Sequence, residues 1–522
     1  MQSGRYGSGA DGTQWRSFNN INTPLLLLLF SCSSILRFPD SCLGPTDHSE
    51  MADCTRIKQL SPLDLTVPTA YINILFAFDT AESTPAVSQR LKVGLDALSK
   101  QHPWLSGRVF ASLTQGKPSL EIRYTSDTAL TLLDKGSIAG PYEILSSQGM
   151  PPEAIPQEVW PLPPVIDNVL AKAGAPVFAT SLFRFADRGV GLCVCLHHNT
   201  VDATAFSEII RQWARNVTGA GLELASPTQF GRIERLSEAL SPQLEAISGL
   251  SYEDLLTKHP EYVKTQPLPA KEPSQQIESP PCTSKVFTIP IHRINDVKET
   301  LGKYTPNLPT TNVILCALLW TAITRARSQR NPSLAEESAT SRLATIVNGR
   351  RRISETFSPP SNPYFGNVVL YARADATAAS ITNPDPELAR TLSEICTRIA
   401  TSQSPSTITA QHIAEVYRLI ADSEDYRTLD PGWDIFGSRD LAITSWADLD
   451  LYEVDFGAGL GRPKFVRLPY MEADGVAVLL PRRRDGMDEV LEVMVLLRRD
   501  DMAVLERDDA WMAVASAVGN LV

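Results

Sequence analysis

The sequence predicts an α/β protein of two domains, and three observations support this prediction. The chain has 522 residues, which is long for one hydrophobic core and sufficient for two domains of roughly 200 residues each. In both halves, apolar stretches of strand character alternate with stretches of helical periodicity, a pattern typical of sheets covered by helices. Between the halves, residues 266–284 contain five prolines among mostly polar residues, as linkers do.

These observations divide the chain into four parts. We expect an N-terminal domain at 51–265, a linker or crossover loop at 266–284 and a C-terminal domain at 285–522. Residues 1–50 are expected to be a disordered extension or leader, because their composition changes where Met51 opens "MADCTRIKQLSPLDL". The alternative is a secretory signal, since basic residues precede the apolar run 24–36, which is too short to span a membrane.

In the first half, the pattern predicts a strand within 66–79 and a helix over 85–101. Residues 177–198 predict a β-hairpin whose turn is "ADRG" at 186–189. A second helix is expected directly after Asp202. The apolar positions that define the two helices are Val87, Leu91, Leu95 and Leu98 in the first, and Phe206, Ile209, Ile210 and Trp213 in the second.

In the second half, "KVFTIP" at 285–290 predicts a strand, and 310–327 predicts a helix capped by Thr311 or Asn312. The Pro- and Ser-rich stretch 358–367 is short enough to be an internal loop.

Charge and cysteine content exclude several classes of function. The formal net charge of −11 argues against a nucleic-acid or anionic-membrane partner, since such proteins carry clustered positive charge. The eight cysteines form no CxxC pair, and Cys193 and Cys195 alternate along a predicted strand, so both face one side. Free thiols that pack as small apolar groups explain this pattern, which favours a reducing compartment and therefore the cytoplasm.

The stretch "CLHHNTVDATAF", residues 195–206, is the strongest candidate for chemistry. Its two histidines end a predicted strand, and Asp202 follows at the start of a predicted helix. A histidine there can serve as a general base. A metal site is the second interpretation, but adjacent strand residues face opposite ways, so His197 and His198 cannot easily bind one ion, and no metal is expected. The third is a core strand that ends in polar residues. These residues alone leave the choice open.

Several motifs in order resemble one known family. "HHNTVDA" and "DFGAGLGRP" (455–463) are similar to signatures of the BAHD acyl-CoA-dependent acyltransferases, especially the fungal branch that resembles trichothecene 3-O-acetyltransferases. Further motifs that resemble this family are "LSPLDL" (60–65), "HPWLSGRV" (102–109), "VNGRRR" (347–352) with "YFGN" (364–367), and "TSW" (444–446). The chain departs from the family pattern at Ala458, where the family has tryptophan.

The resemblance implies a fold and a reaction. The fold would consist of two similar chloramphenicol-acetyltransferase-like domains, each a mixed sheet with helices, with a channel between them. The reaction would move an acyl group from acyl-CoA, with acetyl-CoA as the expected donor, to a hydroxyl or amine of a small specialised metabolite. Acyl-CoA would be a co-substrate, with no bound cofactor, and the enzyme would act as a monomer.

The resemblance also implies roles for six residues. His198 would be the general base that deprotonates the acceptor, which then attacks the thioester directly. Asp202 would be structural, paired with Arg350. Thr444 and Trp446 would be candidate donors to the oxyanion, and Asp455 would belong to a structural motif away from the reacting atoms.

Two alternatives remain beside this interpretation. A free-standing condensation-type enzyme, which takes its acyl group from a carrier-protein thioester, also carries an HHxxxDG motif, although Ala203 here replaces the glycine. A catalytically decayed homologue that only binds its ligand is the other.

Overall fold

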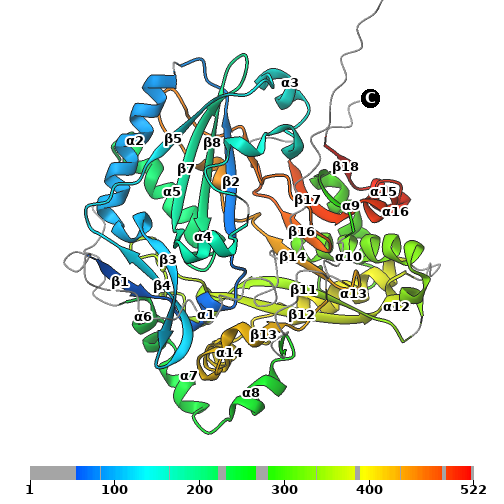
Figure 1. Ribbon diagram of the computed structural model, residues 1–522. Helices are drawn as coiled ribbons and strands as arrows, with labels where there is room; N and C mark the ends of the chain where they lie inside the picture. Colours follow the sequence, from blue (N-terminus) through cyan, green and yellow to red (C-terminus); the bar gives the residue numbers. More distant parts are fainter. Residues whose placement is uncertain are drawn as a thin grey trace, which may run out of the picture.

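The framework of the molecule is a pair of mixed sheets, one built mainly by each half of the chain (Figure 1). The computed structural model describes residues 55–82, 84–163, 165–220, 231–265, 280–336, 338–382, 388–434, 437–484 and 489–518. The predicted extension 1–50 and most of the predicted linker, 266–279, lie outside the described residues. Strands and helices alternate in both halves, so the α/β prediction is confirmed.

The first sheet has five strands, and its two central strands are buried on both faces. All eight residues of β2 and of β8 are buried, which is why both segments are almost continuously apolar. β7 and β8 form the predicted hairpin, with Arg184 paired to Val190. In spatial order the strands are β15 (Phe465–Arg467), β2 (Tyr71–Phe78), β8 (Val190–His197), β7 (Phe178–Arg184) and β5 (Leu132–Ser137).

Two long helices cover one face of this sheet. α2 (Thr84–Gln101) and α5 (Ala203–Thr218) pack against each other, and the apolar positions predicted for both helices are fully buried. The residues of β8 alternate between two cores: Val194 belongs to the core beneath α2 and α5, whereas Cys193 and Cys195 belong to the core on the opposite face. The described cysteines, at 193, 195, 282, 316 and 396, are all free and buried, as predicted.

The second sheet has seven strands from the second half. Three long helices pack around it: α10 (Thr311–Arg330) contacts both α13 (Leu388–Ser402) and α9 (Ile291–Leu301). Thr310 caps α10, since its hydroxyl accepts from Val313 N at 3.3 Å, so the predicted cap at 311 or 312 was one or two residues late. The strand order is β12 (Val369–Thr377), β11 (Thr340–Asn348), β14 (Leu441–Ser445), β16 (Val476–Leu479), β17 (Val490–Arg498), β10 (Cys282–Pro290) and β18 (Ser516–Ala517).

The predicted linker is shorter at its C-terminal end than expected. β10 begins at Cys282 and pairs with β17 from there on, with Cys282 opposite Arg498. The proline pair 280–281 marks the break, because proline cannot donate to the sheet. Residues 282–284 therefore belong to the second sheet and not to the linker.

The second half also contributes to the first. β15 pairs with β2, so the first sheet is completed by residues that lie some 390 positions further along the chain, with Val466 opposite Phe76. A small sheet of β9 (Tyr262–Lys264) and β13 (Leu429–Pro431) makes a second link. A third link is α14 (Ala410–Asp422), which packs on α1 (Pro62–Leu65), α7 (Ser241–Ala246) and α8 (Tyr252–Lys258), as the lower part of Figure 1 shows.

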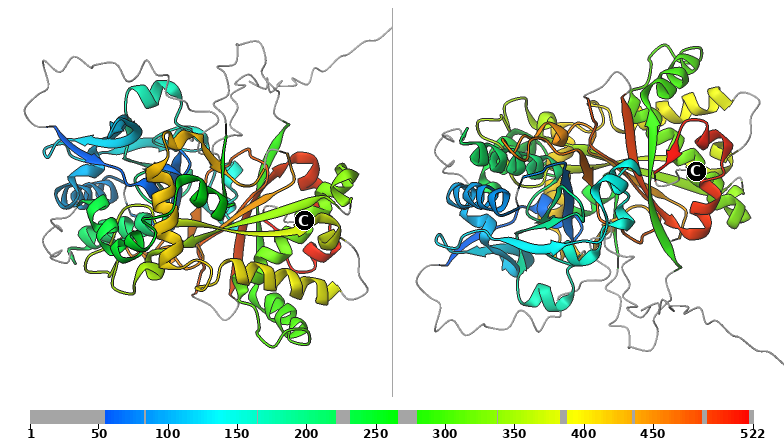
Figure 2. Two further views of the ribbon diagram at one scale, coloured as in Figure 1. Left: turned by 90° about the horizontal axis from the view of Figure 1, so that it is seen from below. Right: turned by 90° about the horizontal axis from the view of Figure 1, so that it is seen from above.

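Smaller elements complete the first half. A four-stranded sheet beside α1 contains β1 (Arg56–Gln59), β4 (Lys117–Tyr124), β3 (Arg108–Thr114) and β6 (Ala175–Pro176). Figure 2 shows the two halves from two further sides: the first half runs from blue to green and the second from green to red. None of the helices in the described part of the chain is both long and apolar enough to cross a bilayer.

Candidate active site

The two histidines stand where β8 ends and the chain turns into α5. His197 is the last residue of β8 and pairs with Tyr71 of β2. The backbone then turns, because Thr200 N and its hydroxyl both donate to His197 O, at 2.8 and 2.7 Å. Asp202 caps α5 by accepting from Ala205 N at 2.9 Å. The sequence folds this way because an aspartate with extended backbone supplies the acceptor that the first helical N–H groups lack.

His197 is buried and structural in its contacts. Its side chain is 1% exposed, and its ring meets that of Tyr71 edge-on, with 5.7 Å between centroids. Its Nδ1 accepts from Asn199 N at 3.3 Å. Burial lowers the pKa of His197 to about 3, so the ring is neutral at ordinary pH.

His198 differs from its neighbour because it is partly exposed while its main chain is held in place. Its N–H donates to Ala70 O at 2.9 Å, and its carbonyl accepts from Asn367 Nδ2 at 2.9 Å. The residue is partly exposed, and Nδ1 of its ring is buried without a hydrogen-bond partner of ordinary geometry among the described residues. Burial lowers the pKa of His198, while its own main chain, the charge of Asp202, the main chain of Val201 and the side chain of Asn367 oppose the shift in part. The ring is therefore neutral near pH 7, as a general base must be.

Asp202 is one end of a buried ion pair with Arg350 of α11 (Arg350–Ile353). Arg350 Nη1 and Nη2 donate to the two carboxylate oxygens of Asp202, at 2.7 and 3.0 Å. Asp202 also accepts from Val368 N at 3.0 Å. Arg350 Nη2 donates in addition to Tyr364 O and Gly366 O, at 3.0 and 2.8 Å. The pair thus ties the histidine loop to the "GRRR" and "YFGN" segments of the second half.

Asp64 is a second buried carboxylate behind His198, and the sequence analysis did not single it out. Its Oδ1 accepts from both Asn367 N and Asn367 Nδ2, at 2.8 and 2.9 Å, and Asn367 Nδ2 is the group that holds the His198 carbonyl. Its Oδ2 accepts from Ser61 N and from Arg232 Nη1, at 2.8 and 3.1 Å. Asp64 therefore supports His198 through one intermediate residue.

The signal for Asp64 was present in "LSPLDL", where Ser61 and Asp64 form a capping box around α1. Arg232 had no comparable signal. It opens α6 (Arg232–Ala239), is 5% exposed, and donates from Nη1 to Thr200 O at 2.9 Å as well as to Asp64. Only the folded chain brings these residues to the histidine loop, since Asp64 and Arg232 are 168 positions apart.

A cavity of about 640 Å³ lies on the second-half side of the histidine loop. Asn348 lines this cavity and donates from Nδ2 to the Thr204 hydroxyl, at 3.0 Å, in the first turn of α5. The other lining groups are mixed: basic Lys298, Arg352 and Arg482, acidic Asp448 and Glu492, and the first residues of α10, Thr310, Thr311 and Asn312. The volume is in the range of small-molecule sites.

Thr444 and Trp446 lie at the edge of the sheet that faces this cavity. Thr444 is in β14, which runs parallel to β11, so the carboxyl end of β14 emerges beside Asn348 at the end of β11. Ser445, between them, lines the cavity. Both Thr444 and Trp446 are partly buried, and within the described ranges neither the Thr444 hydroxyl nor the Trp446 indole N–H is engaged in a hydrogen bond. Two donors are thus free on this rim.

Asp455 lies in a turn that packs against the first half. It is exposed and accepts from Gly457 N at 2.8 Å, and Gly457 has the positive φ of 79° that glycine adopts without strain. Phe456, beside it, is buried edge-on against Phe78 and Trp213. The structure thus places Asp455 in a packing element, without any recorded contact to the histidine loop in the described part of the chain.

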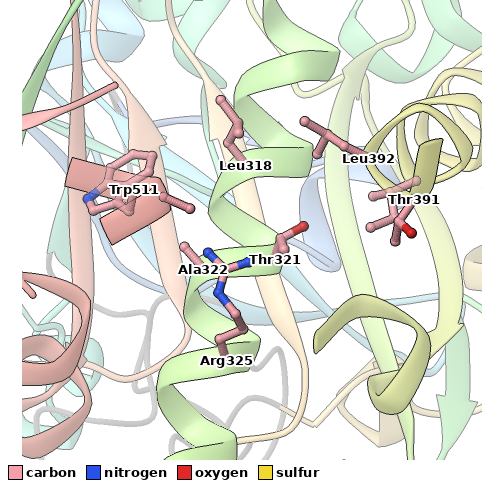
Figure 3. A pocket seen from close by; sticks show the side chains of 9 residues that line it. Leu318, Thr321, Ala322, Arg325, Thr391, Leu392 and Trp511 are labelled. Carbon is pink, nitrogen blue, oxygen red and sulfur yellow. The ribbon is translucent and has the colours of Figure 1, made fainter. Parts of the chain in front are cut away.

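A second, smaller cavity does not belong to this site. It holds about 40 Å³, enough for roughly one water molecule, and is lined mainly by apolar groups between α10, α13 and α16 (Asp509–Met512). Figure 3 shows α10 in the centre, with Trp511 on one side and Leu392 on the other. Arg325 at its edge is already paired with Asp508.

The only group of three metal-ligating side chains within the described ranges is His259, Glu261 and His412, and none of these is in the histidine loop. The loop offers a neutral imidazole on a fixed main chain, which suits proton transfer. The arrangement can remove a proton from a substrate that reaches the His198 ring.

Comparisons with known proteins agree with this chemistry. The Transferase family model matches residues 152–512, more than half of the chain, and the model of the trichothecene 3-O-acetyltransferase-like N-terminal domain matches residues 70–216. Trichothecene 8-O-acetyltransferase from Fusarium sporotrichioides is 27% identical over 498 residues, covering 88% of this chain and 97% of that protein. O-acetyltransferase PtmV from Penicillium ochrochloron is 26% identical, covering 87% and 95%.

Solved structures show the same architecture. F. graminearum TRI101, crystallised with coenzyme A and T-2 mycotoxin, matches with a TM-score of 0.71 at 19% identity, covering 89% of this chain and 100% of that one. Vinorine synthase matches with a TM-score of 0.57 at 16% identity, covering 92% and 98%. The predicted fold of two similar α/β domains is confirmed.

Proposed function

The chain belongs to the Transferase family and is an acyl-CoA-dependent O-acyltransferase, and on this premise we propose that it moves an acetyl group from acetyl-CoA to a hydroxyl of a small specialised metabolite, with His198 as the general base. The two relatives are O-acetyltransferases from fungi, and one of them is named for a trichothecene, which supports both the acetyl donor and the hydroxyl acceptor.

One observation carries the role of His198. The main chain of His198 is held by hydrogen bonds to Ala70 and Asn367, the residue is partly exposed, and burial lowers its pKa. A substrate cannot reach His197 in the same way, because that residue is only 1% exposed. A base that is neutral at working pH and held in a fixed place contributes the most to proton transfer.

The reaction follows from these positions. His198 takes the proton of the acceptor hydroxyl as the oxygen attacks the thioester carbonyl. The C–O bond forms, and the carbonyl oxygen becomes an oxyanion. When this intermediate collapses, the C–S bond breaks, and the leaving thiolate takes the proton from the imidazolium. The free donors of Thr444 and Trp446 are the proposed oxyanion partners, and one such pre-placed donor is worth about 3 kcal/mol of barrier.

We place the coenzyme A moiety in the cavity beside Asn348. Lys298 and Arg352 supply positive charge, and the amino end of α10 supplies free N–H groups, which together suit an anionic phosphate ligand. Arg352→Ala should raise the KM for acetyl-CoA several-fold and leave the KM for the acceptor nearly unchanged. An equal rise in both values would contradict this placement.

Two further proposals rest on the sequence. The protein is proposed to act as a monomer, because each half of the site comes from the same chain, and to work in the cytoplasm, because its described cysteines are free thiols. A carrier-protein thioester as donor stays the second candidate, through the shared HHxxxD motif.

The test is direct. The purified protein is incubated with acetyl-CoA and extracts of fungal metabolites, thiol release is followed, and products are identified by the mass of an added acetyl group. Acetylated product with the wild-type chain and none with His198→Ala supports the proposal. Release of thiol only from an acyl carrier protein would favour the second candidate, and no release from either donor would indicate a ligand-binding homologue.

A further inference from the structure

We propose that His259, Glu261 and His412 form a binding site for one zinc ion, away from the acyl-transfer site, which fastens the two halves of the chain together. The three residues come from two segments far apart in sequence. His259 is the C-cap of α8 and Glu261 lies just before β9, whereas His412 is in the first turn of α14. Figure 1 shows α8 and α14 beside each other at the bottom of the molecule.

The donor atoms already lie close to one another. One ligand atom from each residue is available, and all three atoms are within 4.8 Å of one another. His412 Nε2 is 3.3 Å from Glu261 Oε1, and His259 Nδ1 is 2.8 Å from the same oxygen. In a tetrahedral zinc site with bonds of about 2.0–2.1 Å, neighbouring ligand atoms are about 3.3 Å apart. To admit the ion, His259 Nδ1 would move about 0.5 Å away from Glu261 Oε1, and the two histidine nitrogens would approach each other by up to about 1.5 Å.

The outer partner of His259 is the kind that zinc ligands have. Its other ring nitrogen, Nε2, contacts Glu415 Oε2 at 3.1 Å, and Glu415 is itself held by Lys258 and by Gln411 Nε2. A histidine that binds metal through one nitrogen commonly donates its other N–H to a carboxylate, which fixes the tautomer and turns the free lone pair toward the ion.

His412 gives independent support. Its Nε2 is buried and makes no hydrogen bond in the described part of the chain, although it lies 3.3 Å from a carboxylate oxygen. This buried nitrogen therefore has no partner of its own among the described residues, although a carboxylate oxygen lies beside it. A metal ion satisfies both atoms at once.

The buried carboxylates of this cluster also favour a bound cation. Glu261 and Glu415 are both nearly fully buried, whereas Lys258 is the one lysine paired in the cluster and pairs only with Glu415. One buried negative charge is left, which is costly unless a proton or a metal balances it. Two imidazoles and one carboxylate favour zinc over magnesium or calcium, which prefer oxygen ligands alone. The side chain of His412 is 16% exposed, so the cluster lies near the surface.

The ion would stabilise the fold without taking part in acyl transfer. α14 packs on α8 and also on α1, which holds Asp64 of the active-site network. Because the unfolded chain does not hold these donors together, zinc binding would add to the stability of the folded state.

The experiment uses the full chain after dialysis against a chelator. Titration with Zn²⁺ should show one ion bound per chain and raise the melting temperature. Co²⁺ should bind the same site and give the visible absorption of a tetrahedral N,O complex. His412→Gln and Glu261→Gln should abolish the cobalt spectrum, and Glu415→Gln should weaken zinc binding by about 10- to 100-fold. His292→Gln, at an exposed position on α9, is the matched control and should bind as the wild type does.

Two results would overturn the proposal. One is a wild-type chain that binds no stoichiometric Zn²⁺ or Co²⁺. The other is undiminished binding by folded His412→Gln and Glu261→Gln. If a variant fails to fold, which circular dichroism would reveal, the wild-type cobalt titration still decides. Acyl transfer by the metal-free chain is measured in parallel, so failure of this site is distinct from failure of the proposed activity.

Discussion

At the scale of single residues, the adjacent histidines have different environments, and these environments predict different effects of substitution. His198→Ala should lower turnover by about 10²- to 10⁴-fold, the usual contribution of a general base. Acetyl-CoA binding should survive, because the imidazole acts on the acceptor proton. His197→Ala should instead lower the free energy of unfolding by about 1–3 kcal/mol through lost packing and the lost Asn199 contact, with less effect on turnover of the folded fraction. Steady-state kinetics and thermal melts measure both.

Equal losses of turnover in the two variants, with unchanged melting temperatures, would mean that the base is assigned wrongly. A variant that loses all affinity for acetyl-CoA would contradict the placement of His198 at the acceptor.

The pKa of His198 predicts the pH dependence of the reaction. The base acts only when neutral, and burial lowers its pKa below 6.5, so the acidic limb of kcat/KM should fall below pH 6.5. The charge of Asp202 raises this pKa, so Asp202→Asn should move the limb to still lower pH while lowering stability through the unpaired Arg350. Rates measured across pH with both proteins test this. If the acidic limb moved to higher pH in Asp202→Asn, the charge of Asp202 would not raise the pKa of His198 as we expect.

At the scale of elements, Asp64 links α1, α6 and the segment that holds Asn367, and its substitution should loosen all three. Asp64→Asn leaves Arg232 as a buried charge with only the Thr200 carbonyl, so the free energy of unfolding should fall by about 3–5 kcal/mol. Denaturant unfolding measures the loss. kcat should fall as well, because Asp64 positions Asn367, and the side chain of Asn367 donates to the His198 carbonyl.

Asp455→Asn is the matched control for this prediction. Asp455 is exposed and accepts one hydrogen bond within its own turn, so Asp455→Asn should lower the free energy of unfolding by much less than Asp64→Asn does. If the two variants lost equal stability, the hydrogen bonds around Asp64 would not contribute the stability that we expect of them.

At the scale of the whole molecule, buried neutral histidines predict how stability depends on pH. The folded-state pKa of His197 is about 3 and that of His102 about 4, both below the unfolded value near 6.5. The unfolded chain therefore binds more protons below pH 6.5, and stability is fully present above that pH and lost as the pH falls toward the folded values. For His197 alone the loss between pH 7 and pH 5 is about 2 kcal/mol.

Chemical denaturation at pH 7, 6 and 5 measures this slope. His197→Asn should be less stable at pH 7 but should show a flatter dependence. An unchanged slope in that variant would show that other groups cause the loss.

The sequence by itself determined the fold class and the location of the chemistry. Continuous apolar runs and helical periodicity are local, so β2, β8, α2 and α5 appeared where these patterns predicted them. The histidine loop was found for the same reason, because a strand, two histidines and a helix cap follow one another within a dozen residues. The family resemblance supplied the role of His198 and named Arg350 as the partner of Asp202.

Only the tertiary structure decided which distant residues meet. Asp64, Arg232 and Asn367 converge behind His198 from positions up to 303 residues apart, and β15 completes a sheet of the other half. His259 and Glu415 touch across 156 positions. No local pattern encodes such contacts, because the partner of each donor or acceptor is decided by how the helices and sheets pack together.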